Sequence, residues 1–390
     1  MSVATFNSAQ RTRSLVAVIA AALSVGIAVG AIVPLISLRL EAQGYSRTLI
    51  GINGAMFPIG LLVIGNWLPQ ILRFFGPLRA VYFGVAVTAV SILLLPVLDN
   101  YFAWSVLRLG AGAAGGVYWV MSETWINMMV TDKTRGRVMA LYTAAMAFGF
   151  AVGPEIVARI GIDGFLPFAI VAAMMALSAV PFFFVHDVKP EIPEHAGVNV
   201  LGAVRIAPIV IFAGLAGGAA ESALYVLLPL YGTDSGYDSA NAARLLTWFY
   251  IGNVVLQFPL GAIADRYGRF RLLQVCIAGT LVGAILFPLL FGHLLPLRAM
   301  LLLWGGVTMG IYTLSLSLLG ERFKPGDLSA ANAAYVMMYE FGGLGGPVLA
   351  GGMMDTMGRQ GLPLFAAFTA AAYLVYAAVA RRKAARGERD

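Results

Sequence analysis

The chain is poor in charge, cysteine and histidine. Only 12% of its 390 residues are charged, whereas 60% are hydrophobic, and the mean hydropathy is +0.84. A soluble protein of this length needs far more polar side chains to cover its surface, so lipid must surround most residues. The single cysteine, Cys276, excludes an intrachain disulfide and a cysteine-based metal cluster. The three histidines, His186, His195 and His293, are too scattered in the sequence to indicate a metal site.

Long apolar runs dominate what is present. A helix needs roughly 20 mainly apolar residues to span a bilayer, and twelve runs qualify: 14–39, 47–71, 78–98, 102–128, 137–160, 164–185, 206–231, 243–264, 271–292, 297–320, 329–353 and 362–380. The longest polar stretch, 186–205, contains two prolines and charges of both signs, which is typical of a linker. The sequence predicts an all-α integral membrane protein with six-helix bundles at 1–185 and 206–390, the second ending in a short basic tail.

The positive charges predict the orientation of these helices. If the N-terminus is cytoplasmic, most of the 26 lysine and arginine residues lie on the cytoplasmic side. Basic residues are enriched in cytoplasmic loops, so we expect both termini in the cytoplasm and the chain in the inner membrane. The net charge of +7 then needs no nucleic acid partner. Arg11 and Arg13 precede an apolar run too long for a cleavable signal peptide.

The two halves of the chain repeat each other at an offset of 192 to 195 residues. Tyr142 corresponds to Tyr335, and the stretch 149–154 corresponds to 342–347. Because each half has an even number of helices, the repeats share one orientation. We expect a pseudo-two-fold axis along the membrane normal, with any substrate site between the repeats near the midplane.

Three motifs carry a family resemblance. GAIADRYGR at 261–269 has the form GxxxDRxGR, RLGAG at 108–112 has the form RxxxG, and GFAVGP at 149–154 has the form GxxxGP. With the six-plus-six arrangement and the central loop, the whole chain resembles the major facilitator superfamily, in particular its bacterial drug or metabolite efflux members. The resemblance implies transport by alternating access. The second motif occurs in many proton-coupled members and the third in antiporters.

The sequence departs from the family pattern in two places. In the loop 65–79, Pro69 stands where the Asp-Arg pair would begin. Val157 and Ala158 follow the GxxxGP motif where a glycine pair is expected. The departure at Pro69 favours a stronger gating role for the second half of the chain. The departure at Val157 and Ala158 weakens the indication of antiport, so symport remains an alternative.

These features predict a secondary active transporter. We expect it to export small amphipathic organic molecules in exchange for protons, as a monomer, with the proton gradient in place of any cofactor. The alternatives are a proton symporter or facilitator that imports a metabolite, and a membrane receptor that does not transport. A GxxxxGK[ST] loop is missing and the loops are too short for a nucleotide domain, so we expect no enzyme.

Charged residues inside the apolar runs are the first candidate site. Such a residue costs about 2.5–3.5 kcal/mol on insertion scales and marks function by default. Arg108, Glu123, Glu221 and Glu340 are therefore candidates for proton coupling or substrate binding. The alternatives are an Arg108 bonded to backbone carbonyls, a Glu123 paired with cytoplasmic cations, and interhelical hydrogen bonds for the other two.

Glu155 has a different local pattern from these four residues. Arg159 lies four residues further along the same run. We therefore expect a helical ion pair between them at the outer end.

Three further groups complete the predicted sites. Aromatic residues expected to line the cavity, or else to serve only in packing, are Tyr118, Trp119, Tyr225, Tyr312, Tyr335 and Tyr339. Residues expected to bend helices are Gly149, Gly153, Pro154, Gly346 and Pro347. The cytoplasmic gate is Gly261, Asp265, Arg266, Gly268 and Arg269.

The family resemblance implies that Asp265 and Arg266 latch the cytoplasmic side. The positive N-terminal end of the helix predicted at 329–353 is the expected partner of Asp265. We expect Asp265→Asn to favour the inward-facing state, and changes at Pro69 to matter less.

Overall fold

The protein is almost entirely helical. The structure is a computed structural model that describes residues 7–65, 67–130, 132–185, 204, 206–323 and 325–385. The helices of the first half are α1 (Ser8–Ala42), α2 (Arg47–Gly65), α3 (Leu68–Phe75), α4 (Pro77–Leu94), α5 (Tyr101–Met129), α6 (Asp132–Ile160), α7 (Leu166–Leu177) and the 3-10 helix η2 (Val180–Val185). Those of the second half are α9 (Pro208–Asp234), α10 (Ser239–Tyr267), α11 (Arg269–Leu290), α12 (Leu294–Arg322), α13 (Pro325–Met357), the 3-10 helix η3 (Gly358–Gln360) and α14 (Gly361–Ala385).

Each of the twelve predicted runs forms a helix, and two runs are interrupted. The run 47–71 ends as α2 at Gly65, and α3 begins with Pro69 in its first turn. Proline suits the first turn of a helix, where its missing N–H costs no hydrogen bond. The run 164–185 continues beyond α7 as η2, which contains Pro181. Proline cannot donate the hydrogen bond that a continuing α-helix requires.

Ten segments of the described residues are long and apolar enough to cross a membrane by length and composition alone. One of them, Ala331–Lys383, joins most of α13 to α14, and α5 does not reach the criterion. Helix α5 carries Arg108 and Glu123 together with several glycines, so its hydropathy is lower than that of its neighbours.

The helices form two compact units. The first comprises Met1–Gln43, Asn53–Glu194 and Ser239–Thr247, and the second comprises Gly44–Ile52, His195–Asp238 and Trp248–Asp390. The start of α2 thus belongs with the second half of the chain, and the start of α10 with the first half. The two-domain prediction did not foresee this exchange of helix ends. The predicted linker, 186–205, lies outside the described residues except for Val204.

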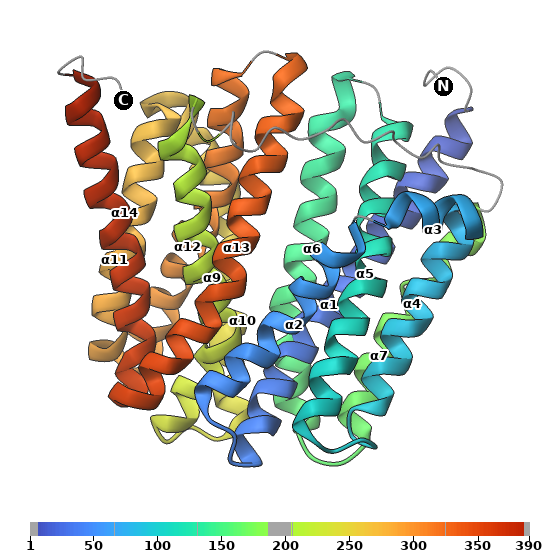
Figure 1. Ribbon diagram of the computed structural model, residues 1–390, viewed down its shortest axis with the longest axis horizontal. Helices are drawn as coiled ribbons and strands as arrows, with labels where there is room; N and C mark the ends of the chain where they lie inside the picture. The colour runs from blue at the N-terminus through green and yellow to red at the C-terminus, as the bar shows by residue number, and fades with distance from the viewer. Residues whose placement is uncertain are drawn as a thin grey trace. The chain divides into compact units, whose positions relative to one another are not determined.

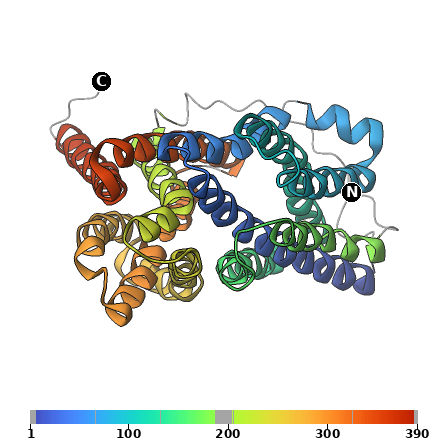
Figure 2. The ribbon, with the colours of Figure 1, turned by 90° about the horizontal axis from the view of Figure 1, so that it is seen from below.

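Within each unit the helices run side by side (Figures 1 and 2). In the first unit α1 packs along α6, and α4 packs on α5 and α7. In the second unit α9 packs along α13, and α11 packs on α12 and α14. Tyr335, Ile311 and Cys276 lie in the buried core of the second unit.

Glycines allow the helices of the two most extensive pairs to approach closely. A methyl group at Gly149 of α6 would lie 2.6 Å from the backbone nitrogen of Ile27 in α1. The matching pair in the second unit is α9 with α13, where Gly342 and Gly346 face the backbone of Leu215 and Ala219. Small residues permit this close backbone approach in membrane helices. The predicted helix-bend residues therefore lie at helix contacts, and Pro154 and Pro347 lie inside α6 and α13.

Candidate functional site

A carboxylate and three tyrosines form the most distinctive polar cluster of the second unit. The Tyr339 hydroxyl on α13 donates a hydrogen bond to Oε2 of Glu221 on α9. The Tyr339 ring lies edge-on to the ring of Tyr312 on α12, with centroids 5.0 Å apart. Tyr335, one turn before Tyr339, has its ring centroid 5.6 Å from that of Tyr312. Four residues that the sequence analysis singled out separately therefore meet in one place.

Two further predicted residues border this cluster. Glu340 follows Tyr339 on α13, is half-buried, and interacts electrostatically with Glu221. Tyr225 lies one turn beyond Glu221 on α9, and its ring lies edge-on to that of Tyr250 on α10, with centroids 5.4 Å apart. Two like charges in a poorly hydrated setting disfavour the state in which both are ionised. The cluster can therefore hold a proton on a carboxylate oxygen.

The corresponding position in the first unit holds aromatic residues without a carboxylate of the same kind. Tyr118 on α5 and Tyr142 on α6 are both buried. The indole nitrogen of Trp119 donates to Oε1 of Glu123, one turn on, at 3.2 Å. Glu123 is exposed, in contrast to the half-buried Glu221 and Glu340. The two half-buried carboxylates among the predicted site residues therefore both lie in the second unit.

Buried hydroxyl groups repeat in both units. Several make no hydrogen bond of ordinary geometry within the described ranges, among them Tyr118, Ser122 and Tyr142 in the first unit and Ser315 and Tyr335 in the second. Ser122 and Ser315 are related by the same repeat offset as Tyr142 and Tyr335. Buried polar groups in native proteins almost always have a partner, so such groups need water or a bound molecule.

Arg108 links two helices of the first unit. Its side chain on α5 is buried, and Nη2 donates to the carbonyl oxygen of Gly54 on α2 at 3.3 Å. Close by, Nδ2 of Asn53 donates to the Ser105 hydroxyl at 3.2 Å. This hydrogen bond to a backbone carbonyl is the structural alternative given above for Arg108. A role of Arg108 in proton coupling stays a prediction.

The predicted gate residues lie where α10 ends and α11 begins. Arg269 joins two carboxylates, Oδ1 of Asp265 at 3.2 Å and Oε1 of Glu321 on α12 at 2.8 Å. Arg266 instead lies over the ring of Tyr267, 5.3 Å from its centroid. Gly268 has a φ of 90°, which favours glycine and separates the two helices with a tight turn.

The gate network thus differs from its prediction in two members. Arg269, rather than Arg266, connects the helices through Asp265, and Glu321 was not singled out from the sequence. Glu321 stands at the end of an apolar run, directly before Arg322 and Lys324, and this position offered a weak local signal. The side chains at the start of α13 as far as Asp327, where we expected the partner of Asp265, lie outside the described residues.

Ion pairs at the other end of the helices were largely missed. Asp355 near the end of α13 accepts hydrogen bonds from the backbone N–H groups of Arg47 and Thr48, at 2.8 and 2.9 Å, and so caps the start of α2. Nη2 of Arg47 also pairs with Asp234 at the end of α9.

A similar set of ion pairs occurs in the first unit. Glu155 accepts from Arg159 at 2.9 Å, which confirms the predicted helical pair, and from Arg244 of α10, also at 2.9 Å. In the second unit a carboxylate of α13 holds the start of α2, and in the first unit a carboxylate of α6 holds the start of α10. Sequence spacing revealed only the pair within one helix.

A resident metal ion has no evident ligand set here. Among the described residues, no three His, Cys, Asp or Glu side chains gather to hold one. The titratable chemistry available to the site is that of carboxylates and phenols.

Comparisons with known proteins agree with this architecture. A sequence model of the family described as Major Facilitator Superfamily matches residues 17–246 and 238–390. The uncharacterized MFS-type transporter YfkF of Bacillus subtilis is 26% identical over 352 residues, covering 88% of this chain and 89% of the relative. The uncharacterized MFS-type transporter YcaD of Escherichia coli O45:K1 is 22% identical over 369 residues, covering 93% and 95%.

Solved structures share the fold. A crystal structure of a mutant form of the nucleoside transporter NupG matches with a TM-score of 0.79 at 13% identity, covering 93% of this chain and 98% of that one. An inward-facing, unoccupied bacterial homologue of the human lysosomal transporter Spinster matches with a TM-score of 0.70 at 13% identity, covering 96% of each chain. At such identities the likeness shows the fold alone.

Proposed function

The chain belongs to the Major Facilitator Superfamily and is a multi-pass membrane transporter rather than an enzyme, and we propose that it exports small amphipathic organic molecules in exchange for protons. Transporters of this family generally need no cofactor, so the proton gradient supplies the energy in this proposal. The protein acts as a monomer in the bacterial inner membrane in this proposal. Both of its termini lie in the cytoplasm, because basic residues gather at that end of its helices.

The hydrogen bond from Tyr339 to Glu221 carries the proposal. It joins a half-buried carboxylate on α9 to a phenol on α13, beside a second carboxylate, Glu340. An ionised Glu221 accepts from Tyr339, whereas a protonated Glu221 no longer attracts that donor as strongly. Loading a proton thus loosens the link between α9 and α13, and releasing it restores the link. A proton carrier that acts on a helix contact is what coupled transport requires.

The rings and hydroxyls around this link favour an amphipathic substrate. Tyr312, Tyr335 and Tyr339 present aromatic faces, which hold flat or cationic molecules. The hydroxyls of Ser315 and Tyr335, which lie close to each other, offer donors and acceptors beside them. Among the described residues no arginine pairs with the Glu221 carboxylate, so the site favours cationic or neutral compounds over anionic ones. The named substrate class of NupG, nucleosides, falls within the neutral part of that range.

The exchanged helix ends support alternating access. Asp355 holds the start of α2, and Glu155 holds the start of α10, at the end of the helices opposite the gate residues. We assign that end to the outside of the cell. These contacts close the outer side, and their release opens it, whereas the Asp265–Arg269–Glu321 network acts at the cytoplasmic end.

Ethidium uptake into inside-out membrane vesicles tests the proposal, because ethidium is a flat amphipathic cation. An acid interior should drive ethidium inward in vesicles that contain the protein, and Glu221→Gln should abolish this drive while leaving exchange between two ethidium pools intact. Glu123→Gln, which removes an exposed carboxylate of the first unit, is the matched control and should keep at least half of the rate.

The same vesicles separate the alternatives. Uridine, a neutral nucleoside, is tested in parallel because a similar fold belongs to a nucleoside transporter. Movement of either compound in the same direction as protons would replace export by symport. Flux of both compounds that is independent of any proton gradient would replace it by facilitated diffusion. No flux with either, in vesicles shown to contain folded protein, would contradict the proposed substrate range.

A further inference from the structure

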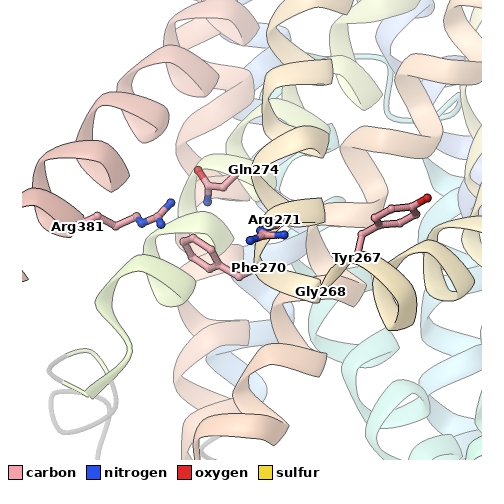
Figure 3. A pocket seen from close by; sticks show the side chains of 6 residues that line it. All are labelled: Tyr267, Gly268, Phe270, Arg271, Gln274 and Arg381. Atoms are coloured by element: carbon pink, nitrogen blue, oxygen red, sulfur yellow. The ribbon is translucent and has the colours of Figure 1, made fainter. Parts of the chain in front are cut away.

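A basic pocket lies at the junction of α10, α11 and α14, all in the second unit. It has a volume of about 470 Å³ and is lined by Tyr267, Gly268, Phe270, Arg271, Gln274 and Arg381. Figure 3 shows the side chain of Arg381 extending from α14 toward Phe270 and Arg271 on α11. The pocket is distinct from the Glu221–Tyr339 cluster and from the Asp265–Arg269–Glu321 network.

No carboxylate among the described residues neutralises either guanidinium group of the pocket. Within the described part of the chain, neither Arg271 nor Arg381 forms an ion pair. The neighbouring Arg269 differs, because Asp265 and Glu321 both contact it. Two uncompensated positive charges on one pocket attract an anion with two or more accepting oxygens, and phosphate suits the planar fork of arginine.

The remaining lining residues hold the pocket in shape. The guanidinium carbon of Arg381 lies 5.3 Å from the ring centroid of Phe270, a cation–π contact that keeps this side chain over the pocket. Nε2 of Gln274 donates to the Tyr373 hydroxyl at 3.1 Å and so ties α11 to α14. This bond holds the Gln274 side-chain amide in one orientation and joins α11 to α14 beside the pocket.

An exposed apolar wall continues from the pocket along α11. Val275, Val282, Leu286 and Leu289 have 61%, 52%, 41% and 70% of their surface exposed. At 3.6 residues per turn they lie within roughly 60° of the direction of Arg271. The wall extends for roughly 27 Å from Arg271, close to the thickness of a bilayer's hydrocarbon core. Val375 and Val379 of α14, the helix that packs on α11, are also exposed, at 64% and 48%.

We propose that this pocket binds the phosphate headgroup of an anionic glycerophospholipid of the cytoplasmic leaflet, with its acyl chains along α11. Unpaired cations at one end of a long hydrocarbon wall match a molecule that is anionic at one end and apolar along its length. Basic pockets between membrane helices on the cytoplasmic side are suited to such headgroups. Free phosphate shares the headgroup chemistry but makes no use of the wall.

Native mass spectrometry of the purified, delipidated protein tests this site with phosphatidylglycerol, phosphatidylcholine and inorganic phosphate as probes. The wild type should bind phosphatidylglycerol, and the double variant Arg271→Gln/Arg381→Gln should bind it about thirtyfold more weakly, roughly fivefold for each lost charge. The double variant Arg271→Lys/Arg381→Lys keeps both charges and should retain most of the affinity.

The matched control removes two charges elsewhere. Arg79 occupies the position of Arg271 in the first repeat, and Arg382 follows Arg381 on α14. The double variant Arg79→Gln/Arg382→Gln should bind phosphatidylglycerol within twofold of the wild type. If the control variant loses as much affinity for phosphatidylglycerol as Arg271→Gln/Arg381→Gln does, the proposed site is overturned. Equal binding of phosphatidylcholine by the wild type, or displacement of phosphatidylglycerol by inorganic phosphate, would overturn its assignment to an anionic lipid.

A melting temperature for each variant shows that it is folded. If the double glutamine variant is not folded, the single variants Arg271→Gln and Arg381→Gln carry the test, because each should bind phosphatidylglycerol about fivefold more weakly than the wild type. Lipid binding is measured without substrate or proton gradient. Its outcome is therefore independent of the proposed direction and coupling of transport.

Discussion

At the scale of single residues, the link between Glu221 and Tyr339 is the feature on which the account depends. The sequence places an isolated glutamate in one apolar run and a tyrosine in another, 118 positions apart. Each was recognisable alone, because ionisable groups and aromatic residues stand out in apolar runs. Their pairing was not, because it depends on how α9 packs along α13. The same reason explains why Glu321 was missed as the partner of Arg269.

The first prediction concerns the energy of this link. At alkaline pH, where Glu221 is ionised, Tyr339→Phe should lower the free energy of unfolding by about 1.5–3 kcal/mol, because a hydrogen bond to a charged group is lost. In the Glu221→Gln background the same change should cost less, by at least about 1 kcal/mol, because the charged acceptor is already absent. Urea unfolding in detergent measures all four proteins of this cycle. Tyr225→Phe, whose ring lies beside Tyr250 instead, serves as control. Additive losses would show that the two side chains are not coupled.

At the scale of helices, the sequence predicted most of what the structure contains. All twelve runs form helices because each is long and apolar enough to be helical in a bilayer. The two interruptions, after Gly65 and after Leu177, lie shortly before Pro69 and Pro181, and the hydropathy of the runs does not reveal them. The close contacts of α1 with α6 and of α9 with α13 involve glycines that the repeat had already matched, such as Gly149 with Gly342.

The second prediction concerns these close contacts. Gly149→Ala should lower the free energy of unfolding by about 1–3 kcal/mol, because the added methyl overpacks the contact with Ile27 of α1. Gly110→Ala on α5 is the control, since a methyl there meets no atom within 4 Å. It should be neutral or slightly stabilising, as alanine is the better helix former. Thermal unfolding in one detergent compares the two. Equal destabilisation by both changes would exclude the close approach of α1 and α6 as the cause.

At the scale of the whole molecule, the exchanged helix ends were beyond sequence reasoning. Hydropathy and the repeat divide the chain at 186–205, yet the starts of α2 and α10 belong with the opposite halves of the chain. Local spacing revealed Glu155 with Arg159, but no local rule relates Arg47 to Asp355, 308 residues away. Contacts of this kind depend on the assembled fold.

The third prediction concerns the opening of the outer side. Asp355→Asn removes the charge that caps α2, a contribution of about 1–2 kcal/mol in partly buried geometry. A cysteine at Ile50, which is 1% exposed, should then react five- to thirtyfold faster with a membrane-impermeant maleimide added outside, in a Cys276→Ser background. Asp163→Asn, which breaks the exposed pair with Arg39, is the control and should leave the rate unchanged. Equal rates in all three proteins would mean that Asp355 does not hold α2 closed.

The central claim is that Glu221 carries the proton that the substrate displaces, and proton release from the purified protein measures it directly. Ethidium is added to detergent-solubilised protein in weakly buffered solution with a pH indicator. The account predicts that the wild type releases protons, that Glu340→Gln still does so, and that Glu221→Gln releases none while ethidium still binds. Undiminished proton release from Glu221→Gln would contradict it.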